Sequence, residues 1–459
     1  MAKLLAAELQ AGAYPPGTRL PSVRQLCEQH GASLATVTHA LHELEDAGLI
    51  AARPRRGFFA LAAARPKRPA SAAVAIELAG RRKRLMALAA TQSGCLSLGH
   101  LALPAELLPL RPLSRLLTQL LRSDAALMAS GTVYGTAELR EQLALRGARM
   151  ACPFDAEDIV VTQGWTESLE LCLRLLCKPG DSVAVASPAP LRALELLAQL
   201  DLQVVEIPAS AETGLAVPAL AFAQQHQRIT ACLVEPTFDC ATGSLMSDAA
   251  KQDLAELAAR HGLAVIECDM MGELHAGPQR PRPLKAFDRD ERVLYCGSFA
   301  CITGPGCSLG YIVSGRYRLQ LRAARTVHGE LLPLLTDQLL TRFMASGGLD
   351  AHLRRLRQRL AAQRQAYVQA VLSLFPSGTR VSKSAGSYLL WLELPPGLDA
   401  CTLLEQARHL GYTFVPGAVF STGHPFDHCL RLSARHPLDE AHLQGIRVLG
   451  ELAAGLLER

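Results

Sequence analysis

Apolar positions with helical spacing run through most of the first fifty residues. The pattern predicts a first helix over residues 1–12 and a second that starts with Ser22 as its cap and stops at Gly31. A third helix follows Ser33, which can cap it, and its apolar face consists of Val37, Leu41 and Leu44. Polar side chains lie on the other faces of this third helix, where they can meet a partner: Thr36, Thr38 and His39.

Two short apolar runs, residues 49–53 and 57–61, flank a turn of proline, two arginines and glycine. Three helices followed by such a hairpin predict a winged helix-turn-helix, in which the third helix enters the major groove of DNA and the wing holds phosphates. A three-helix protein-interaction domain is the alternative. The residues expected at DNA are Arg19, Ser22, Arg24, Ser33, Thr36, Thr38, His39, Arg53, Arg55 and Arg56.

From about residue 155 onward, short β-rich runs alternate with longer helical runs. The β-rich runs are DIVVTQG, DSVAVAS, TACLVEP, LAVIECD, RVLYCGSFA and LGYIVS. This alternation predicts an α/β domain with a mostly parallel sheet that is covered by helices. After about residue 350, a long helix over residues 351–375 leads into the runs SYLLWLEL, TFVPG and LRLSA, which predict a second, smaller α/β layer.

Charge is concentrated in one segment between these parts. Residues 65–84 carry seven Lys/Arg and one Glu, a net charge of +6, in a Pro/Ala-rich stretch, whereas the whole chain carries only +5. The segment is interpreted as a linker, either a solvated tether or one that also touches DNA phosphate. The predicted organisation is a winged helix at 1–63, the basic linker at 64–90, a large domain at 91–349 and a small domain at 350–459.

Composition restricts the class of protein. Of the 459 residues, 49% are hydrophobic and 19% charged, which is typical of a globular protein. There is no apolar run of about 18 residues and no signal-peptide pattern at the N-terminus, so we expect a cytoplasmic protein with no membrane partner. The thirteen cysteines, odd in number and irregular in spacing, predict reduced thiols rather than a disulfide framework.

Specific sequence motifs go beyond these patterns. PPGTRLPSVRQL, RPRRGFF and S-x-x-TV-x-x-AL-x-x-L-x-x-x-GLI resemble the GntR-type winged helix, except that Leu34 stands where many members carry arginine. VVTQGWTESLEL, KPGDSVAVASP, GPGCSLGY and YLLWLELPPGLDA resemble the type I aminotransferase fold. Their order is similar to that of MocR-type regulators. The resemblance implies a homodimeric, DNA-binding transcription regulator with a double-stranded operator and an unidentified small-molecule or metal effector.

The same resemblance implies where pyridoxal phosphate (PLP) would bind in an enzyme of this fold. The Schiff-base lysine position is Cys301, the pyridine-facing aspartate is Cys268, the ring-contacting tyrosine is Met271 and the asparagine is Cys240. The stacking aromatic is Pro190, and the phosphate-binding arginine and serine are Ser308 and Ala300. Ser298, the turn of residues 164–166 and the carboxylate-binding Arg431 persist. We therefore expect no aminotransferase activity and no cofactor, with PLP held non-covalently as the alternative.

Other residues near this pocket leave alternatives open. Strand alternation predicts that Asp269 aims away from the ring, and Lys285 is expected at the surface. Cys240, Cys268 and Cys301 should face one volume, where they would be small apolar fillers, ligands for Zn(II) or Cu(I), or a thiol switch. Arg431 either pairs with an acid inside the fold or binds a small carboxylate. The predicted effector pocket comprises Trp165, Thr166, Cys240, Cys268, Met271, Ser298, Cys301, Ser308 and Arg431.

Overall fold

The structure is a computed structural model, and it divides the chain into two compact units, residues 1–81 and 82–459. It describes residues 17–46, 50–53, 57–60, 94–423 and 425–458, together with residues 1, 2, 4, 5, 8 and 14. Most of the predicted first helix, Arg55 and Arg56 of the turn, and the linker of residues 64–90 lie outside the described residues.

The first unit contains two helices and a hairpin in the described part. Helix α2 (Val23–His30) starts at a capping box formed by Ser22 and Gln25 and ends at Gly31 in the left-handed conformation, as the sequence predicts. Helix α3 (Leu34–Asp46) is followed by strands β1 (Ile50–Arg53) and β2 (Gly57–Ala60), which pair antiparallel. The predicted apolar face of α3 forms the core with Leu26 and Ile50: Val37, Leu41 and Leu44 are all buried.

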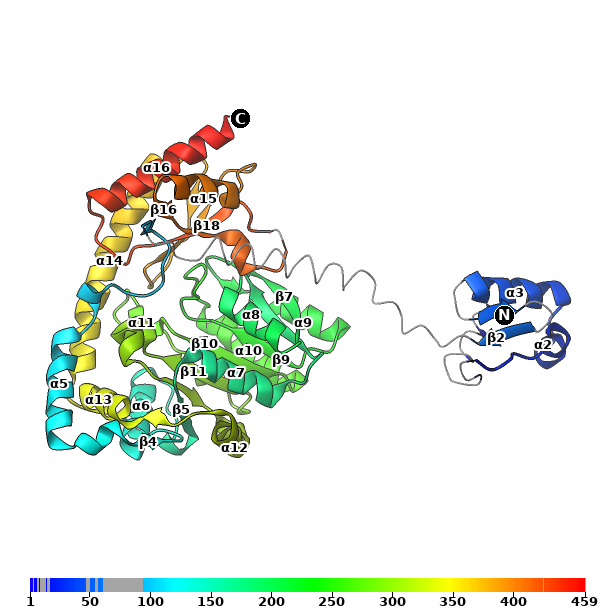
Figure 1. Cartoon of the computed structure of the whole chain (residues 1–459), viewed down its shortest axis with the longest axis horizontal. Helices are drawn as coiled ribbons and strands as arrows, with labels where there is room; N and C mark the ends of the chain where they lie inside the picture. The colour runs from blue at the N-terminus through cyan, green and yellow to red at the C-terminus, as the bar shows by residue number, and fades with distance from the viewer. Residues whose placement is uncertain are drawn as a thin grey trace. The chain divides into compact units, whose positions relative to one another are not determined.

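The second unit is built on an eight-stranded sheet of order β5-β12-β11-β10-β9-β6-β7-β8 (Figure 1). Strands β6, β7, β9, β10 and β11 run parallel, and β12 lies antiparallel between β11 and β5. The strands are β5 (Ile159–Thr162), β6 (Ser182–Ser187), β7 (Gln203–Ser210), β8 (Gly214–Leu215), β9 (Ala231–Val234), β10 (Ala264–Asp269), β11 (Val293–Ser298) and β12 (Gly310–Val313). Six match the predicted runs. β7 and the short β8 were not predicted.

Helices cover both faces of this sheet, so the domain has three layers (Figure 1). One face packs on α7 (Trp165–Leu176), α8 (Leu191–Gln199) and α12 (Arg318–His328). The opposite face packs on α6 (Ala137–Arg149), α9 (Val217–His226), α10 (Asp248–His261), α13 (Leu334–Ala345) and α14 (Gly348–Leu374). The predicted arrangement of a largely parallel, helix-covered sheet is confirmed.

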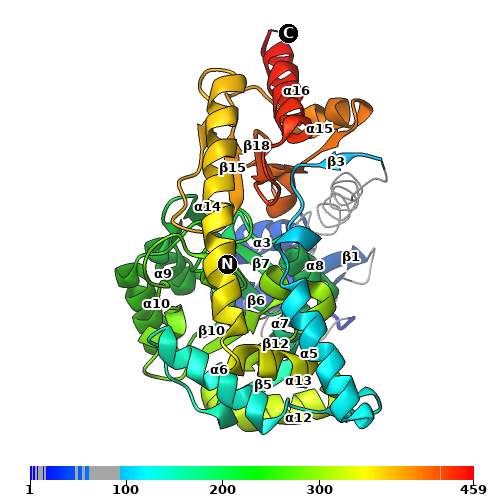
Figure 2. The ribbon, with the colours of Figure 1, turned by 90° about the vertical axis from the view of Figure 1, so that its left-hand side faces the viewer.

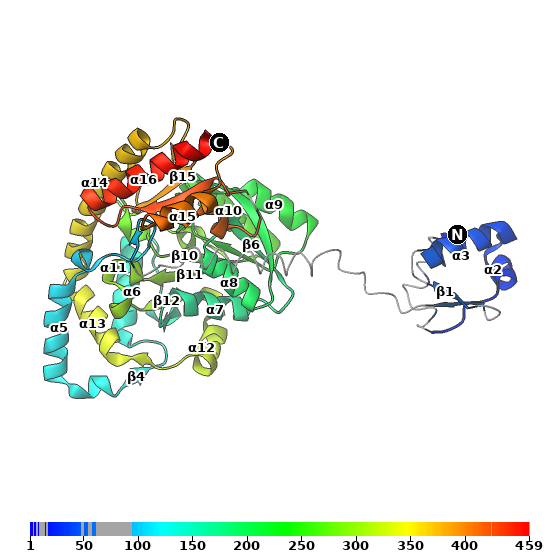
Figure 3. The same ribbon diagram turned by 45° about the horizontal axis from the view of Figure 1, so that its top comes forward.

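Helix α14 runs beside the large sheet and continues into the smaller layer (Figures 2 and 3). This layer has a four-stranded sheet of order β14-β15-β18-β17, and two further helices, α15 (Ala400–His409) and α16 (Glu440–Leu457), pack against it. Its strands are β14 (Arg380–Val381), β15 (Leu389–Glu393), β17 (Val415–Pro416) and β18 (Cys429–Ser433).

Segments far apart in sequence are joined by short strand pairs. Strand β3 (Leu96–Ser97) pairs parallel with β16 (Tyr412–Thr413), which brings the segment after β3 against the small layer. Strand β4 (Gly131–Thr132) pairs with β13 (Leu332–Pro333), and the remaining helices are α5 (Leu110–Ser123) and the short α11 (Ala300–Thr303). In the part of the chain that the structure describes, none of the helices has the length and hydrophobicity needed to cross a membrane.

Candidate functional site

A cavity of about 670 Å³ opens where the sheet's strands end and the small layer begins. Ligands of open α/β sheets bind at this carboxyl edge of the strands, because the loops that follow the strands and the N-termini of the helices converge there. The large domain lines the cavity with Gln163, Gly164, Trp165, Thr166, Pro190, Leu191, Arg192, Cys240, Met270, Ser298, Ala300, Cys301, Pro305 and Ser308. The remaining lining residues are Ser97, Gly99, His100, Leu101, Thr413, Phe414, Val415, Val419, Phe420 and Arg431.

Most of the predicted pocket residues lie in this cavity, and two do not. Met271 is fully buried in the core, and its sulfur accepts a hydrogen bond from the Ser387 hydroxyl at 3.2 Å. The chain turns directly after β10, where the Gly272 amide donates to Asp269, so that Met270 rather than Met271 reaches the cavity. The seven residues placed as predicted are Trp165, Thr166, Cys240, Ser298, Cys301, Ser308 and Arg431.

The expectation that three cysteines face one volume is wrong for Cys268. Cys240 and Cys301 line the 670 Å³ cavity, but Cys268 packs with Trp165 in the core between the sheet and α7. It borders a separate, narrower cavity of about 30 Å³, which shares only the walls formed by Trp165 and Pro190. The difference arises because Cys268 lies within strand β10, where its face of the sheet is already covered by α7.

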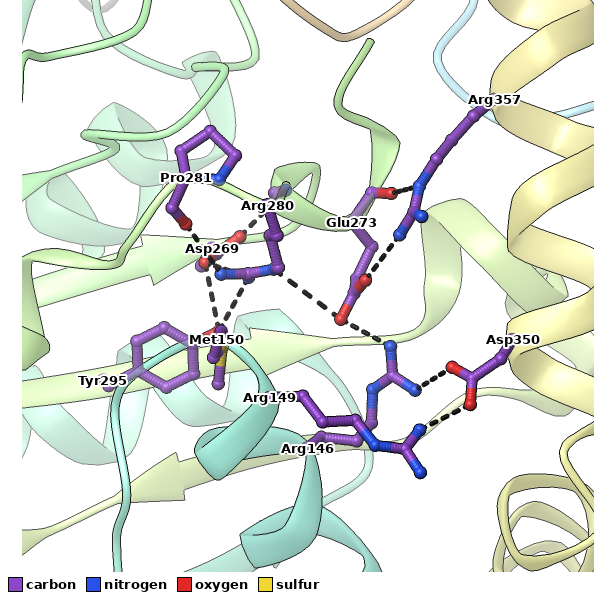
Figure 4. Close-up of polar contacts among 11 residues, drawn as sticks. Arg146, Arg149, Met150, Asp269, Glu273, Arg280, Pro281, Tyr295, Asp350 and Arg357 are labelled. Carbon is purple, nitrogen blue, oxygen red and sulfur yellow. Dashed lines mark hydrogen bonds and ion pairs between the residues drawn. The ribbon is translucent and has the colours of Figure 1, made fainter. Parts of the chain in front are cut away.

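Asp269 aims away from the cavity, as strand alternation predicts. Its carboxylate accepts from the Arg280 guanidinium at 2.6 Å, the Tyr295 hydroxyl at 3.1 Å and the Gly272 amide at 2.9 Å (Figure 4). Tyr295 belongs to the core on the face of the sheet opposite to that of Cys268. Asp269 is thus part of a structural network and is not a wall of the cavity.

That network centres on Glu273 (Figure 4). Its carboxylate meets Arg146 of α6 at 2.6 Å, Arg357 of α14 at 3.0 Å and Arg280 at 3.6 Å. Although burial opposes ionisation, these guanidinium groups lower the pKa of Glu273 to about 2. Asp350 pairs with Arg146 on the other side, so every buried charge here has a partner of opposite sign. The network ties α6 and α14 to the loop after β10.

Arg431 has a different environment. The residue is 8% exposed, and its guanidinium donates to the Cys240 carbonyl at 2.6 Å and the Gly99 carbonyl at 3.1 Å, while lying over the Phe420 ring. Burial lowers its pKa from the ordinary value. Among the described residues, no carboxylate forms an ion pair with it. Of the two alternatives for Arg431, the structure therefore does not support pairing with an internal acid, and the residue lines the cavity.

The backbone of Cys240, whose carbonyl accepts from Arg431, is also bonded by a buried carboxyl, that of Glu235. Its Oε2 accepts from the Cys240 amide at 2.7 Å, so the backbone of Cys240 lies between Glu235 and Arg431. Its Oε1 is buried and has no hydrogen-bond partner in the part of the structure that is described. Burial raises the pKa of Glu235 to about 8, because the ionised form is poorly solvated there. At neutral pH this carboxyl is largely protonated.

The two cavity thiols are poor ligands and poor nucleophiles as they stand. Burial and the nearby Glu235 raise the pKa of Cys301 to about 12, and the same two causes raise the pKa of Cys240 well above its ordinary value. The thiolate is the reactive and metal-binding form. Across the described ranges, no group of three or more His, Cys, Asp or Glu side chains gathers in a way that could hold a metal ion.

No lysine is found among the residues that line the cavity. Lys285 is not the surface residue that the sequence suggested: its side chain is only 10% exposed, and its amine pairs with Asp288 at 2.7 Å. Lys251 is fully buried, and its amine donates to the Arg282 carbonyl and the Thr237 hydroxyl. Neither amine reaches the cavity.

The sequence reasoning missed a second group of lining residues. They include Arg192 at the start of α8, His100 and Gly99 after β3, and the aromatic rings of Phe414 and Phe420. With Arg192 and Arg431 present and no Asp or Glu among the residues named above, the lining carries a positive charge. His100 and Gly99 reach the cavity through the β3–β16 pairing, which no local pattern reveals. The start of α8, next to Pro190, was visible in the sequence.

In the first unit, the described residues that are predicted to contact DNA are exposed or partly exposed. Arg19, Arg24 and Arg53 are exposed, and Arg53 lies over the Phe59 ring at 4.6 Å. The Ser22 hydroxyl belongs to the capping box of α2. Ser33, Thr36 and His39 are exposed on α3, and Thr38 is partly exposed.

Comparison with known proteins agrees with this geometry. Residues 96–444 match the family "Aminotransferase class I and II", and residues 1–60 match "Bacterial regulatory proteins, gntR family". The chain belongs to the class I and II aminotransferase family. Within this family it joins the fold to a GntR-type DNA-binding domain.

Relatives of this aminotransferase-family chain share either the whole arrangement or the larger domain. The HTH-type transcriptional regulators YjiR and YdcR of Escherichia coli K12 are 31% and 32% identical to it, covering 100% and 98% of this chain and 99% and 98% of their own. The kynurenine aminotransferase of Pyrococcus horikoshii superposes with a TM-score of 0.76 at 26% identity, covering 83% of this chain and 95% of its own.

Proposed function

We propose that the protein is a homodimeric transcription regulator whose aminotransferase-like domain binds a small carboxylate non-covalently and has no aminotransferase activity. The observation that carries this proposal is Arg431. A buried guanidinium held by two carbonyl oxygens and the face of the Phe420 ring, in a cavity with no acidic wall, has lost most of its hydration without gaining a counter-charge. A carboxylate ligand supplies that charge.

The residues of the cavity do not fit PLP. No lysine lines the cavity, and Cys301, which the resemblance puts at the lysine position, is one of the lining residues. The carboxylate next to Cys268 in the sequence, Asp269, is held by Arg280 and Tyr295 outside the cavity and cannot keep a pyridine nitrogen protonated there. Ser308 offers a hydroxyl where the resemblance implies an arginine. These features support a regulator that does not use the cofactor, and PLP held without a covalent bond remains the alternative to test.

The remaining cavity wall supports a ligand with an apolar part. Phe414, Phe420, Val415 and Val419 of the small layer face Trp165 and Leu191 of the large domain. Because the ligand contacts both layers, its binding favours one relative position of the two. A change in the position of the small layer relative to the large domain would in turn alter the placement of the two winged helices in a dimer.

Homodimerisation is supported by apolar side chains left exposed on the large domain. Leu319 and Val327 of α12 are each 76% exposed, and Leu331 is 61% exposed. An interface that covers such residues gains hydrophobic burial, and a two-fold dimer would present two winged helices to two half-sites. Sedimentation at micromolar concentration should give a dimer, and a monomer that binds its operator as a single copy would contradict this part of the proposal.

The direct test of effector binding measures DNA affinity of the full chain with and without carboxylates. DNA selected by the wild-type protein is titrated in the presence of acetate, succinate, glutarate or phenylacetate. We expect at least one acid to change the affinity in the wild type and to have no effect in Arg431→Gln. Arg149→Gln, which removes an arginine from the Glu273 network, is the control and should respond like the wild type. An equal response in Arg431→Gln would exclude the proposed site.

The thiol-responsive alternative has its own test. Because the Cys240 and Cys301 thiols are protonated and buried, we expect iodoacetamide at neutral pH to leave both unmodified in the native protein. Peptide mass spectrometry gives the extent of alkylation at each cysteine. Rapid alkylation of either residue, with loss of DNA binding, would favour the thiol switch over the carboxylate sensor.

A further inference from the structure

Leu34 is a large apolar side chain at the N-terminal end of α3, the predicted recognition helix. It is the first residue of α3 and is 61% exposed, and it does not belong to the core of the unit. Residues at the N-terminal end of a recognition helix are the ones that reach base edges in the major groove. A single exposed leucine is ordinary on a protein surface, so its meaning depends on its neighbours.

The polar groups around Leu34 are already engaged within the helix. The Ser33 hydroxyl accepts from the Thr36 amide at 3.2 Å and shares a hydrogen bond with the Thr36 hydroxyl at 2.8 Å. The Thr38 hydroxyl donates to the Leu34 carbonyl at 2.8 Å. His39 lies 3.3 Å from Glu43, its partner one turn further along. These local bonds use part of the hydrogen-bonding capacity of the three hydroxyl groups, whereas the Leu34 side chain is exposed and makes only apolar contacts possible.

We propose that Leu34 reads thymine in the operator through the thymine 5-methyl group. Thymine is the base that presents an apolar group in the major groove, and an exposed leucine at the start of the recognition helix matches it. Arg19 and Arg24 are exposed cations available for phosphate, which holds the helix in register but reads no sequence. This inference rests on the proposed function, since it requires that the winged helix bind DNA.

The test uses the full-length protein and DNA altered by one methyl group. Duplexes selected from a random pool by the wild type identify the preferred site, and each thymine is then replaced by deoxyuridine, which differs only in lacking that methyl. We expect one replacement in each half-site to weaken wild-type binding about fourfold, the effect of one buried methyl group. The same replacement should have no effect on Leu34→Ala. Leu110→Ala, which removes an exposed leucine of the other unit, should keep the wild-type penalty.

A second variant changes the preference instead of removing it. In Leu34→Arg, a parallel selection should enrich guanine at the position where the wild type enriches thymine, because arginine makes paired hydrogen bonds to guanine. If no deoxyuridine substitution weakens wild-type binding, or if the penalty persists in Leu34→Ala, the inference is wrong while DNA binding stands. If the wild type selects no sequence at all, the inference and the DNA-binding function both fail.

Discussion

The second unit buries arginine side chains in two contrasting ways. Around Glu273, Arg146, Arg280 and Arg357 lie against carboxylates, and the acid at the centre stays ionised down to about pH 2. At the cavity, Arg431 is buried to a similar degree but meets only carbonyl oxygens. The two regions show that burial of a charge alone does not indicate function.

What distinguishes the regions is whether the protein supplies the counter-charge. The Glu273 network is complete within the chain and joins α6, α14 and the loop after β10. At the cavity, the backbone of Cys240 lies between Arg431 and Glu235, and the Glu235 carboxyl is largely protonated at neutral pH, so it does not supply a counter-charge. Leaving a buried cation unpaired has a free-energy cost that a structural role does not justify. We take the unpaired charge as the mark of the ligand site.

The largest effect is expected from breaking the complete network. Glu273→Gln removes the negative charge that the guanidinium groups of Arg146, Arg280 and Arg357 share and should lower the free energy of unfolding by about 3–5 kcal/mol. Urea denaturation followed by circular dichroism measures the change. Glu170→Gln, which breaks the exposed helical pair of Glu170 with Arg174, should cost less than about 1 kcal/mol. Equal effects of the two substitutions would mean that the network is not a structural element.

The dependence of stability on pH should distinguish the two buried glutamates. The folded-state pKa of Glu273 is about 2, below its ordinary value, so its contribution of roughly 3 kcal/mol is present above pH 4.5 and is lost as the pH falls toward 2. The folded-state pKa of Glu235 is raised to about 8, so Glu235 lowers stability as the pH rises from 4.5 to 8. Unfolding curves of Glu273→Gln and Glu235→Gln against pH should each lose the corresponding slope. A retained slope in either variant would contradict the assigned ionisation.

Carboxylate binding tests the other region of the comparison, the cavity around Arg431. An effective acid should raise the melting temperature of the wild type, and Arg431→Gln should weaken its binding roughly tenfold to a hundredfold, the strength of a charged hydrogen bond. Calorimetric titration gives the dissociation constants. Arg149→Gln provides the matched control, because its guanidinium belongs to the network and not to the cavity. An equal loss of carboxylate affinity in the two variants would mean that the overall positive charge of the protein, and not a site at Arg431, attracts the acid.

The smallest effect is expected at the DNA-binding surface. Arg24→Ala should weaken operator binding and reduce the slope of log affinity against log salt by about one, the contribution of one phosphate contact. Fluorescence anisotropy at several salt concentrations measures both quantities. Arg289→Ala, which removes an exposed arginine of the second unit, should leave them unchanged. An unchanged slope in Arg24→Ala would place phosphate contacts elsewhere.

Much of the fold could be predicted because local patterns and tertiary structure agree. The caps at Ser22 and Gly31 end α2 as predicted, and the buried β-rich runs became strands of the large sheet. β7 was missed because its residues, Gln203–Ser210, are mostly half-buried at the far side of the sheet and lack the continuous apolar run of the central strands. The pairing of β3 with β16 joins positions more than 300 residues apart, which no local pattern encodes.

The candidate site could be predicted only in part. Arg431 and Cys301 were located correctly because each lies in a motif with fixed flanking residues. Met271 was misplaced because the chain turns directly after β10, at Asp269, and Cys268 was misplaced because α7 covers its face of the sheet. The burial of Lys285 depends on its pairing with Asp288, a contact that composition does not reveal.

The most direct test of the central claim is native mass spectrometry of untagged protein purified without chelators and dialysed against PLP-free buffer, before and after addition of PLP and then of small carboxylates. Our account predicts a dimer that retains no PLP and that binds one carboxylate per subunit through Arg431. A stoichiometric mass increment equal to PLP that survives dialysis would contradict the account, since it would show that the cavity still holds the cofactor.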